Sequence, residues 1–436
     1  MNAIAGESGL RLSLDRRSVT HWLAGRQPRA PLPDLVAEAL SRGLGCHLTA
    51  ATVGMAKPPA RRRTPPTPSG SGPGTDAGDD GFEVQDVSER LQKLGYVDPR
   101  RQMVDQGVFR IAALSVPSWA QALSQARTRI PGDDAGHPVA LEARRVRTAE
   151  LLIAVFADSD DAFGGGHQQA ALSSYLAAEI APLLHAPGSA RDARALRAAA
   201  CQLTYLAAFM CFDQEQHALA QRYYRIALDL AAEAGDTGAY AVTLRAMSVQ
   251  ARVIGHHRHA VHLAEAAATT GRALTSLRRA FLLGQLAVAR AADADRAGAL
   301  SSLSAAERYL ERAGSGLSSG EAVGAYHPAA LAHQQAAVQA LLGDRQGAVA
   351  ALTQSLATRP ADERRSRAIT TGRLAELHLA TGHLDQAIAT WHSFLDDYPH
   401  LRSERTTTCL TQMRQQLRPH TRHPAARHLL TRAATM

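Results

Sequence analysis

The sequence predicts an all-α protein in which most of the chain forms a right-handed solenoid of antiparallel helix pairs. Hydrophobic residues make up 45% of the chain but aromatic residues only 5%, and alanine and leucine carry most of the apolar content. These two residues favour helices. The sustained alternation of apolar and polar residues that strands require is absent from the sequence. From about residue 140 onward, glycine and proline interrupt the helical pattern at regular intervals, which is typical of a helical repeat.

The clearest repeat unit lies near the C-terminus. Its small residue Ala375 is followed 12, 16, 19 and 24 residues later by Ala387, Trp391, Phe394 and Pro399. In such a unit, the small residues lie where two helices meet, the large residue fills the space between them, and the proline ends the second helix. This spacing resembles the tetratricopeptide repeat (TPR), so the fold we expect is a TPR-like α-solenoid.

Four further units follow the same frame. They comprise Ala208, Ala220, Tyr224 and Ala227; Ser248, Ala260, Ala264 and Ala267; Ala287, Ala299, Leu303 and Ala306; and Ala336, Ala348, Leu352, Ser355 and Pro360. The second small residues of the five units are 40, 39, 49 and 39 residues apart, whereas the ideal period is ~34 residues. We therefore expect stretched connections. The longest step contains the glycine-rich loop 314–328, which is either a surface insertion or a cover over the groove.

Stacked repeats expose the first helix of each pair along a concave surface, where partners bind. A protein, peptide or small-molecule partner is therefore expected in this groove. The alternative role for the aromatic residues among the candidates is packing between repeats. The groove residues expected from the repeat frame are Tyr205, Phe209, Phe212, Arg245, Arg252, His333 and Glu376.

The chain divides into four parts by composition. Residues 1–56 precede a stretch at 57–81 that is rich in proline, glycine, serine and arginine and is expected to be a disordered linker. Residues 82–140 are expected to lead into the array through two short helices at about 87–94 and 119–126. Residues 141–430 are expected to form the repeat domain.

The positive charge is concentrated near the N-terminus. Residues 10–63 hold ten basic and three acidic side chains, a net charge of +7, whereas residues from 64 onward hold a net charge of only +2. A nearly neutral array has no electrostatic reason to attract nucleic acid, but a basic N-terminal unit does.

The N-terminal unit contains a recognisable motif in the stretch SVTHWLAGRQP. Val19, Trp22 and Leu23 form an apolar stripe on a short helix that ends at Gly25, and a second helix follows from Pro33. The stretch resembles the helix-turn-helix of phage-repressor-like (Xre-type) regulators. Together with the repeats, the chain resembles actinobacterial regulators that join such a domain to TPR repeats.

This resemblance implies a recognition helix over residues 16–24 that lies in the major groove of DNA. Its polar side chains would contact base edges and its arginines would contact phosphates. The alternative role for the arginines is a solvated helix face. The implied DNA-binding residues are Ser18, Thr20 and His21 for bases, and Arg16, Arg17, Arg26 and Arg29 for phosphates.

The motif departs from the family in one respect. Members of that family have two helices before the recognition helix, but only fourteen residues precede Asp15 here. We therefore expect a partial helix-turn-helix, or a true start upstream of Met1. A partial unit would leave Val19 and Trp22 poorly covered and would bind DNA weakly or not at all.

The sequence shows no convincing motif of catalysis: it contains no H-E-x-x-H and no phosphate-binding loop. His256, His257, His259 and His262 cluster, but they fall in a turn and at the start of a helix, where polar residues are common. The four scattered cysteines, the absence of a secretory signal and the absence of a long apolar run predict a reduced, cytoplasmic protein that does not enter a membrane. We expect no enzyme activity, cofactor or metal.

Two functions remain open from the sequence. The first is a transcriptional regulator that binds DNA through its N-terminal motif and a partner through the array, as a homodimer associated with the nucleoid. The second is an adaptor that acts through the array alone and retains only a vestigial helix-turn-helix.

Overall fold

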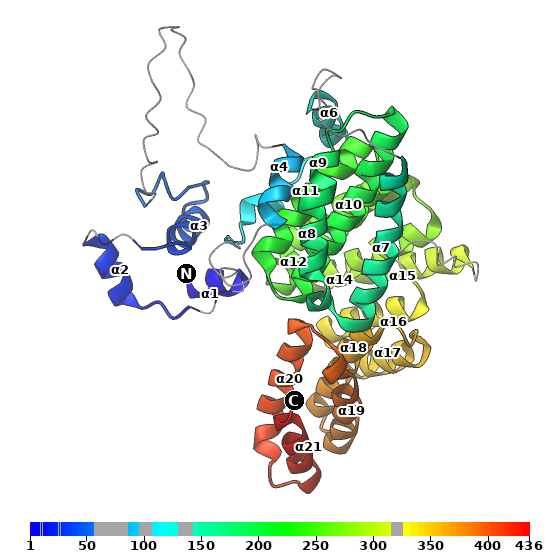
Figure 1. The fold of residues 1–436 in the computed structure, drawn as a ribbon. Helices are drawn as coiled ribbons and strands as arrows, with labels where there is room; N and C mark the ends of the chain where they lie inside the picture. Colours follow the sequence, from blue (N-terminus) through cyan, green and yellow to red (C-terminus); the bar gives the residue numbers. More distant parts are fainter. Residues whose placement is uncertain are drawn as a thin grey trace, which may run out of the picture.

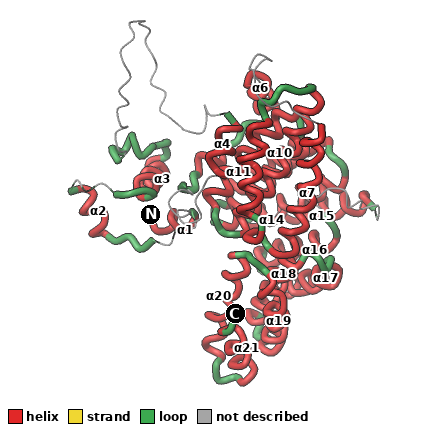
Figure 2. The backbone as a smooth tube through the Cα atoms, in the orientation of Figure 1, coloured by secondary structure: helices red, strands yellow, loops and turns green. Residues whose placement is uncertain are grey.

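The computed structural model describes residues 1–55 apart from Gly9, Arg11, Gly25 and Gln27, and residues 86–95, 107–129, 143–314 and 326–436. Within these residues the chain forms helices joined by turns and loops, without a strand (Figure 2). The expected linker at 57–81 and most of the glycine-rich loop at 314–328 lie outside the described residues. The prediction of an all-α solenoid is confirmed.

Five antiparallel helix pairs form the body of the array (Figure 1). Each pair corresponds to one of the five units expected from the sequence. The pairs are α10 (Ala190–Asp213) with α11 (His217–Ala234), α12 (Thr237–Val253) with α13 (His257–Thr270), α14 (Ser276–Ala292) with α15 (Arg296–Ala313), α16 (Pro328–Leu341) with α17 (Arg345–Thr358), and α18 (Arg364–Ala380) with α19 (Leu384–Asp397).

Small residues set the distance between the two helices of each pair. The second small position of every unit is completely buried, so a larger side chain there would push the helices apart. These positions are Ala220, Ala260, Ala299, Ala348 and Ala387, each with 0% exposure. Trp391 and Phe394, the large residues of the last unit, are also buried.

The turns inside two of the five pairs combine a left-handed residue with an aspartate cap. Between α16 and α17, Gly343 has a φ of 89°, and the Asp344 carboxylate accepts the N–H of Gly347 at 2.8 Å. The turn between α14 and α15 has the same form, although Ala294 takes the left-handed conformation there with a φ of 64°. An aspartate cap satisfies one of the free N–H groups at a helix start.

Further helices flank the five pairs. Helices α4 (Val87–Gly95) and α6 (Trp119–Arg129) lie where two short helices were expected, and both pack against α11. The 3₁₀ segment η1 (Ile111–Leu114) lies between them. Helix α7 (Ala143–Phe163), η2 (Gly165–His167), α8 (Gln169–Tyr175), η3 (Leu176–Ile180) and α9 (Ala181–Leu183) precede the first pair. Segment η4 (Gly271–Ala273) precedes α14, and η5 (Tyr398–His400), α20 (Glu404–Leu417), η6 (Arg418–His420) and α21 (Pro424–Ala434) follow the last pair.

The array curves until its last pair meets the helix that precedes its first. The C-terminal end of α7 lies beside α18 (Figure 1). The N–H of Arg402, in the loop before α20, donates to the carbonyl of Phe163 at 2.7 Å, and the N–H of Gly166 donates to the carbonyl of Arg402 at 2.9 Å. This closure was not expected from the sequence.

Glycines permit this close approach of two loops. A Cβ atom on Gly164 would lie 2.8 Å from the carbonyl oxygen of Arg402, and one on Gly165 would lie 2.7 Å from the carbonyl oxygen of Met210. Side chains are therefore excluded at both positions. The glycine run at 164–166, which the sequence shows only as a break between helices, is a contact between the two ends of the array.

The N-terminal unit consists of α1 (Asn2–Glu7), α2 (Arg16–Leu23) and α3 (Leu32–Leu44). Helices α1 and α3 pack through a small core that includes Ile4, Leu10 and Leu35. This core also takes in Val108, which belongs to the segment that leads toward the array. The N-terminal unit is therefore packed against the following segment and is not held by a linker alone.

One helix among the described residues is long and apolar enough to cross a membrane by length and composition, namely α10, although no such run was expected from the sequence. Of the window that meets this test, 72% is buried inside the protein. Packing at the centre of the helical array accounts for that composition.

Candidate functional site

The inner side of the curved array contains a cavity of about 300 Å³. Its lining comes from the first helices of all five pairs, α10, α12, α14, α16 and α18, together with α7 and α20. Because the two ends of the array meet, helices far apart in the sequence face each other across this cavity.

Three arginines in the cavity each lie over a phenylalanine ring. The pairs are Arg245 with Phe281, Arg365 with Phe209 and Arg405 with Phe212, with the guanidinium carbon 3.6, 4.8 and 4.9 Å from the ring centroid. A cation over an aromatic face contributes about 0.5–2 kcal/mol, depending on how far it is desolvated. The stacks also present a flat surface that is both apolar and positively charged.

Carboxylates neutralise one part of the cavity. Nη1 of Arg365 lies 2.7 Å from Oδ2 of Asp160, and Nη2 lies 2.9 Å from Oδ1 of Asp161. Asp213 lies 3.9 Å from both Arg365 and Arg405. Burial raises the pKa of Asp160 to about 7, an effect that Arg365 opposes and Asp213 increases. One buried guanidinium therefore serves several carboxylates.

A second cluster, in which a histidine and an arginine both contact one carboxylate, lies at the start of α18. Nε2 of His327 lies 2.6 Å from Oε1 of Glu363, and Nη1 of Arg359 lies 2.5 Å from Oε2. Burial opposes ionisation of Glu363, but these two partners outweigh it and lower the pKa of its carboxyl. Arg359 and Arg365 are thus both occupied by carboxylates of the protein.

His333 is a buried histidine that lines the cavity. Its Nδ1 lies 3.0 Å from the Thr370 hydroxyl oxygen. Burial, with the nearby charge of Arg373 as the next cause, lowers the pKa of His333 to about 3. The imidazole is therefore uncharged at neutral pH.

Arg245 differs from these groups because no carboxylate of the described residues forms an ion pair with it. Its Nε donates to the carbonyl of Phe281 at 3.1 Å, and its stack on the same ring fixes its position. Burial lowers the pKa of its guanidinium, while the nearby tyrosine Tyr205 opposes this. The Arg245 charge thus has no counter-charge of its own.

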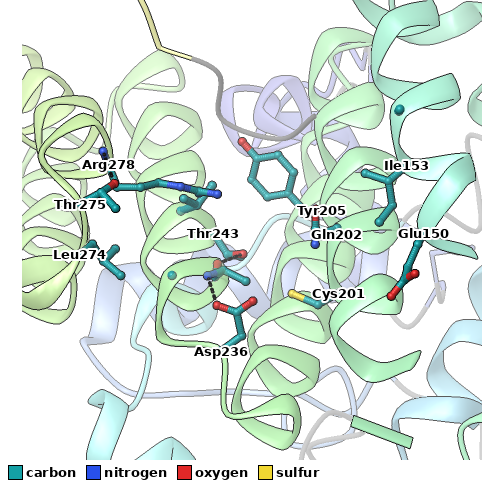
Figure 3. Close-up of a pocket in the computed structure, with 14 residues that line it drawn as sticks. Glu150, Ile153, Cys201, Gln202, Tyr205, Asp236, Thr243, Leu274, Thr275 and Arg278 are labelled. Atoms are coloured by element: carbon teal, nitrogen blue, oxygen red, sulfur yellow. Dashed lines mark hydrogen bonds between the residues drawn. The ribbon is translucent and has the colours of Figure 1, made fainter. Parts of the chain in front are cut away.

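A larger cavity of about 570 Å³ adjoins the first at Tyr205, which lines both. Tyr205 and Arg278 point toward its middle, and Glu150, Ile153 and Cys201 lie on the side away from Arg278 (Figure 3). Two of its other polar side chains cap helices. The Asp236 carboxylate accepts the N–H of Ala239 at 2.9 Å, and the Thr275 hydroxyl accepts the N–H of Arg278 at 3.4 Å.

Five of the seven groove residues expected from the sequence line the smaller cavity together. They are Tyr205, Phe209, Phe212, Arg245 and His333. Arg252 lies one turn beyond the lining residue Val249 on α12, and Glu376 lies beyond the lining residues of α18. Tyr205 and Phe212 are only 7% and 2% exposed, so these two rings also pack between helices.

Sequence reasoning missed several lining residues. Asp160 and Arg405 belong to α7 and α20, which lie outside the five repeat units. Phe281 lies in α14, six residues before the frame position Ala287, and extending the frame by one turn toward the N-terminus would have found it. Arg365 is likewise in a first helix, ten residues before Ala375.

The residues expected to bind DNA lie on α2 and in the loop that follows it. Ser18 is half-buried and the other six, Arg16, Arg17, Thr20, His21, Arg26 and Arg29, are exposed. The hydroxyls act locally: Ser18 donates to the Asp15 carboxylate and Thr20 donates to the carbonyl of Arg16, each at 3.0 Å.

Helix α2 does not pack as the recognition helix of a complete helix-turn-helix does. It contributes no buried residue, and Val19 and Leu23 are 42% and 84% exposed. Trp22 is half-buried. The apolar stripe of α2 is thus poorly covered, as expected for a partial unit.

The described residues define the class of this protein as an all-α solenoid of TPR-like helix pairs.

Residues 1–56 match the family described as the SP15 N-terminal domain. No curated protein matches the chain. Among solved structures, it is similar to a crystal structure from Podosopora anserina, described under the name kinesin light chain and as nearly identical TPR-like repeats. The identity is 20%, the TM-score is 0.32, and the similarity covers 44% of this chain and 92% of that chain.

The N-terminal match bears on the resemblance to Xre-type regulators. The family that matches residues 1–56 is not described as a helix-turn-helix family. The expected kinship with those regulators therefore gains no support from this comparison.

Proposed function

We propose that this protein is a scaffold that binds a segment of a partner protein in the cavity on the inner side of its array. The observation that carries the proposal is the set of three arginine–phenylalanine stacks that line this cavity. Residues that combine a large flat surface with a charge contribute most to binding at protein interfaces. Here they come from five different helices and face one space.

The chemistry of the cavity favours a segment with an acidic and an apolar side chain. Arg245 offers a guanidinium that no carboxylate of the described residues neutralises, and Phe281 beneath it offers an apolar face. An acidic side chain would pair with the first and an apolar one would pack on the second.

Selection of binding segments from a random peptide library tests this function. Selected peptides are expected to bind the full-length protein and to lose at least tenfold in affinity when Arg245 is replaced by glutamate. Arg308→Glu is the matched control, because Arg308 is exposed on the second helix of a pair, α15. Peptides that bind both variants equally, or that protect only outer helices from hydrogen exchange, would exclude the inner cavity as the binding site.

Binding of duplex DNA by α2 is the second candidate function. The exposure of Arg16, Arg17 and His21 on one short helix favours it, and a DNA-binding form would be expected to act as a dimer in the cytoplasm. Fluorescence anisotropy with a labelled duplex at increasing salt provides the test. A regulator should bind with an affinity that falls steeply with salt and is reduced by Arg16→Gln with Arg17→Gln. If the protein does not bind duplex DNA at low salt, the scaffold function remains as the single candidate.

A further inference from the structure

We propose that Arg252, Arg373 and Arg405, at one end of the inner cavity, form a binding site for a phosphate group. This inference deepens the proposed function of the cavity and rests on it. It names the chemistry of one part of the ligand, which either the bound segment or a small phosphate ester would supply.

The three arginines come from three helices that line the cavity. Arg252 lies three residues after Val249 on α12, and Arg373 lies three residues after Thr370 on α18. Both Val249 and Thr370 line the cavity, and residues three apart share a helix face. Arg405 on α20 lines the cavity itself. The three side chains therefore continue the surface of the cavity beyond its lining.

The hydrogen-bonding capacity of these arginines is not met within the described residues. Nε of Arg252 is buried and has no hydrogen-bond partner there. Neither Arg252 nor Arg373 has a described carboxylate within ion-pair distance, and the nearest ion pair of Arg405 is the one to Asp213 at 3.9 Å. A buried donor without a partner costs free energy that a bound acceptor would recover.

The three charges also act on one another. Burial and then the charges of Arg373 and Arg405 lower the pKa of Arg252 to about 10. Burial likewise lowers the pKa of Arg405, with Asp213 opposing and Arg365 and Arg373 adding to the effect. Like charges at short range repel one another. An anion between them would convert the repulsion into attraction.

Other groups near this end do not provide that anion. Glu376 attracts Arg373 without forming an ion pair, and burial raises the pKa of its carboxyl. Glu215 accepts a hydrogen bond from Thr408 at 2.9 Å. Burial raises the pKa of the Cys409 thiol to about 11, so the thiol is neutral at neutral pH.

Guanidinium groups from three directions fit a phosphate better than a carboxylate. A guanidinium donates two parallel hydrogen bonds to an oxyanion, and one such group can already engage both oxygens of a carboxylate. A phosphate ester carries about −1.5 to −2 charges and three acceptor oxygens, which three arginines can share.

Titration of the full-length protein with inorganic phosphate at low salt, followed by calorimetry and by thermal unfolding, tests the site. We expect saturable binding and a rise in Tm with phosphate. Arg252→Gln and Arg373→Gln are each expected to weaken binding at least tenfold. The matched controls Arg308→Gln and Arg345→Gln, exposed on the outer helices α15 and α17, are expected to leave it unchanged.

The same variants separate a ligand site from a structural role. In phosphate-free buffer, Arg252→Gln should unfold at the same Tm as the parent or a higher one, because it removes an unpartnered cation. A lower Tm there would overturn the proposal, and so would equal phosphate affinity in all four variants. Because Arg373 is exposed, its variant keeps the test valid if Arg252→Gln fails to fold.

Two further titrations test whether the site prefers phosphate to a carboxylate and identify the source of the phosphate group. Acetate binding as tightly as phosphate would overturn the choice of a phosphate group. A phosphoserine peptide that binds more tightly than inorganic phosphate supports a phosphate on the partner segment, whereas equal binding supports a small phosphate ester. Peptide binding through Arg245 without phosphate binding would refute this inference alone. Phosphate binding without any peptide binding would refute the proposed scaffold function but would still support the phosphate-binding site.

Discussion

Nη1 of Arg365 on α18 lies 2.7 Å from Oδ2 of Asp160 on α7, and both side chains are 4% exposed. This pair joins the last repeat pair to the helix that precedes the first. It lies beside the backbone contact between Arg402 and Phe163. The array is thereby held as a closed curve, and this closure sets the size of the inner cavity.

Replacing Arg365 by glutamine is expected to destabilise the fold by about 3–5 kcal/mol, because Asp160 would remain buried without its cation and Asp213 would keep only Arg405 nearby. Urea unfolding followed by circular dichroism measures this loss. Arg145→Gln is the control, since its pair with Glu179 is exposed and spans 3.8 Å. An exposed pair contributes at most about 1 kcal/mol. A similar small loss in both variants would show that the buried pair does not hold the array closed.

The contribution of Asp160 to the stability of the protein should fall as the pH rises from 3.8 to about 7. Burial raises the pKa of Asp160 to about 7 from a model-compound value of 3.8, so the folded state keeps a proton that the unfolded state has released between these values. Asp160→Asn has no such proton to lose. Its stability relative to the parent should therefore increase between pH 5 and pH 8 in urea unfolding experiments. A relative stability that decreases over this range would contradict the raised pKa.

Gly165→Ala is expected to cost about 1–3 kcal/mol, because the new Cβ would lie 2.7 Å from the carbonyl oxygen of Met210 and must displace backbone. Hydrogen exchange should also increase around residues 402–406 as the two loops separate. Gly372→Ala is the control. Its new Cβ would lie no closer than 3.7 Å to Cys409, so it should be neutral or stabilise α18 by about 0.5–1 kcal/mol. Equal stability of the two variants would argue against tight packing at Gly165.

Glu7→Gln is expected to loosen the N-terminal unit from the array. The Glu7 carboxylate lies 2.6 Å from Nη2 of Arg42 and 3.2 Å from Nε2 of His256, in the turn between α12 and α13. Hydrogen exchange of α1 and α3 should therefore rise while the array stays protected. Glu89→Gln, exposed on α4, should leave both regions unchanged. Faster exchange throughout the array would mean that Glu7 stabilises the whole fold.

Acid should weaken the same contact. Burial opposes ionisation of Glu7, but the hydrogen bonds from His256 and Arg42 outweigh it and lower the pKa to about 2 from 4.5. The contact is thus complete above pH 4.5 and is lost as the pH falls toward 2. In Glu7→Gln, exchange in α1 and α3 should lose this dependence on pH.

The sequence predicted the repeat units because their signal is local. Small residues such as Ala348 and Ala387 recur at fixed offsets from turns, and the structure buries both completely. The candidate groove was predicted in part for the same reason, since Tyr205, Phe209 and Arg245 belong to first helices of the frame. Their partners Phe281 and Arg365 were missed because they lie outside the frame positions considered.

The exposure of Val19 on α2 was also expected from the sequence. The attachment of the N-terminal unit to the array was not expected from the sequence. It depends on Glu7 meeting His256, 249 residues later in the sequence, and a lone carboxylate gives no sign of its distant partner.

The sequence by itself determined that this protein is a stack of five helix pairs, because helix periodicity and the spacing of small residues are encoded within each unit. Only the tertiary structure decided that the stack closes on itself, that arginines lie over phenylalanines inside it, and which charged side chains line its cavity. These features depend on the curvature that accumulates over all the pairs. That curvature is a sum of small packing angles, and no single stretch of sequence specifies it.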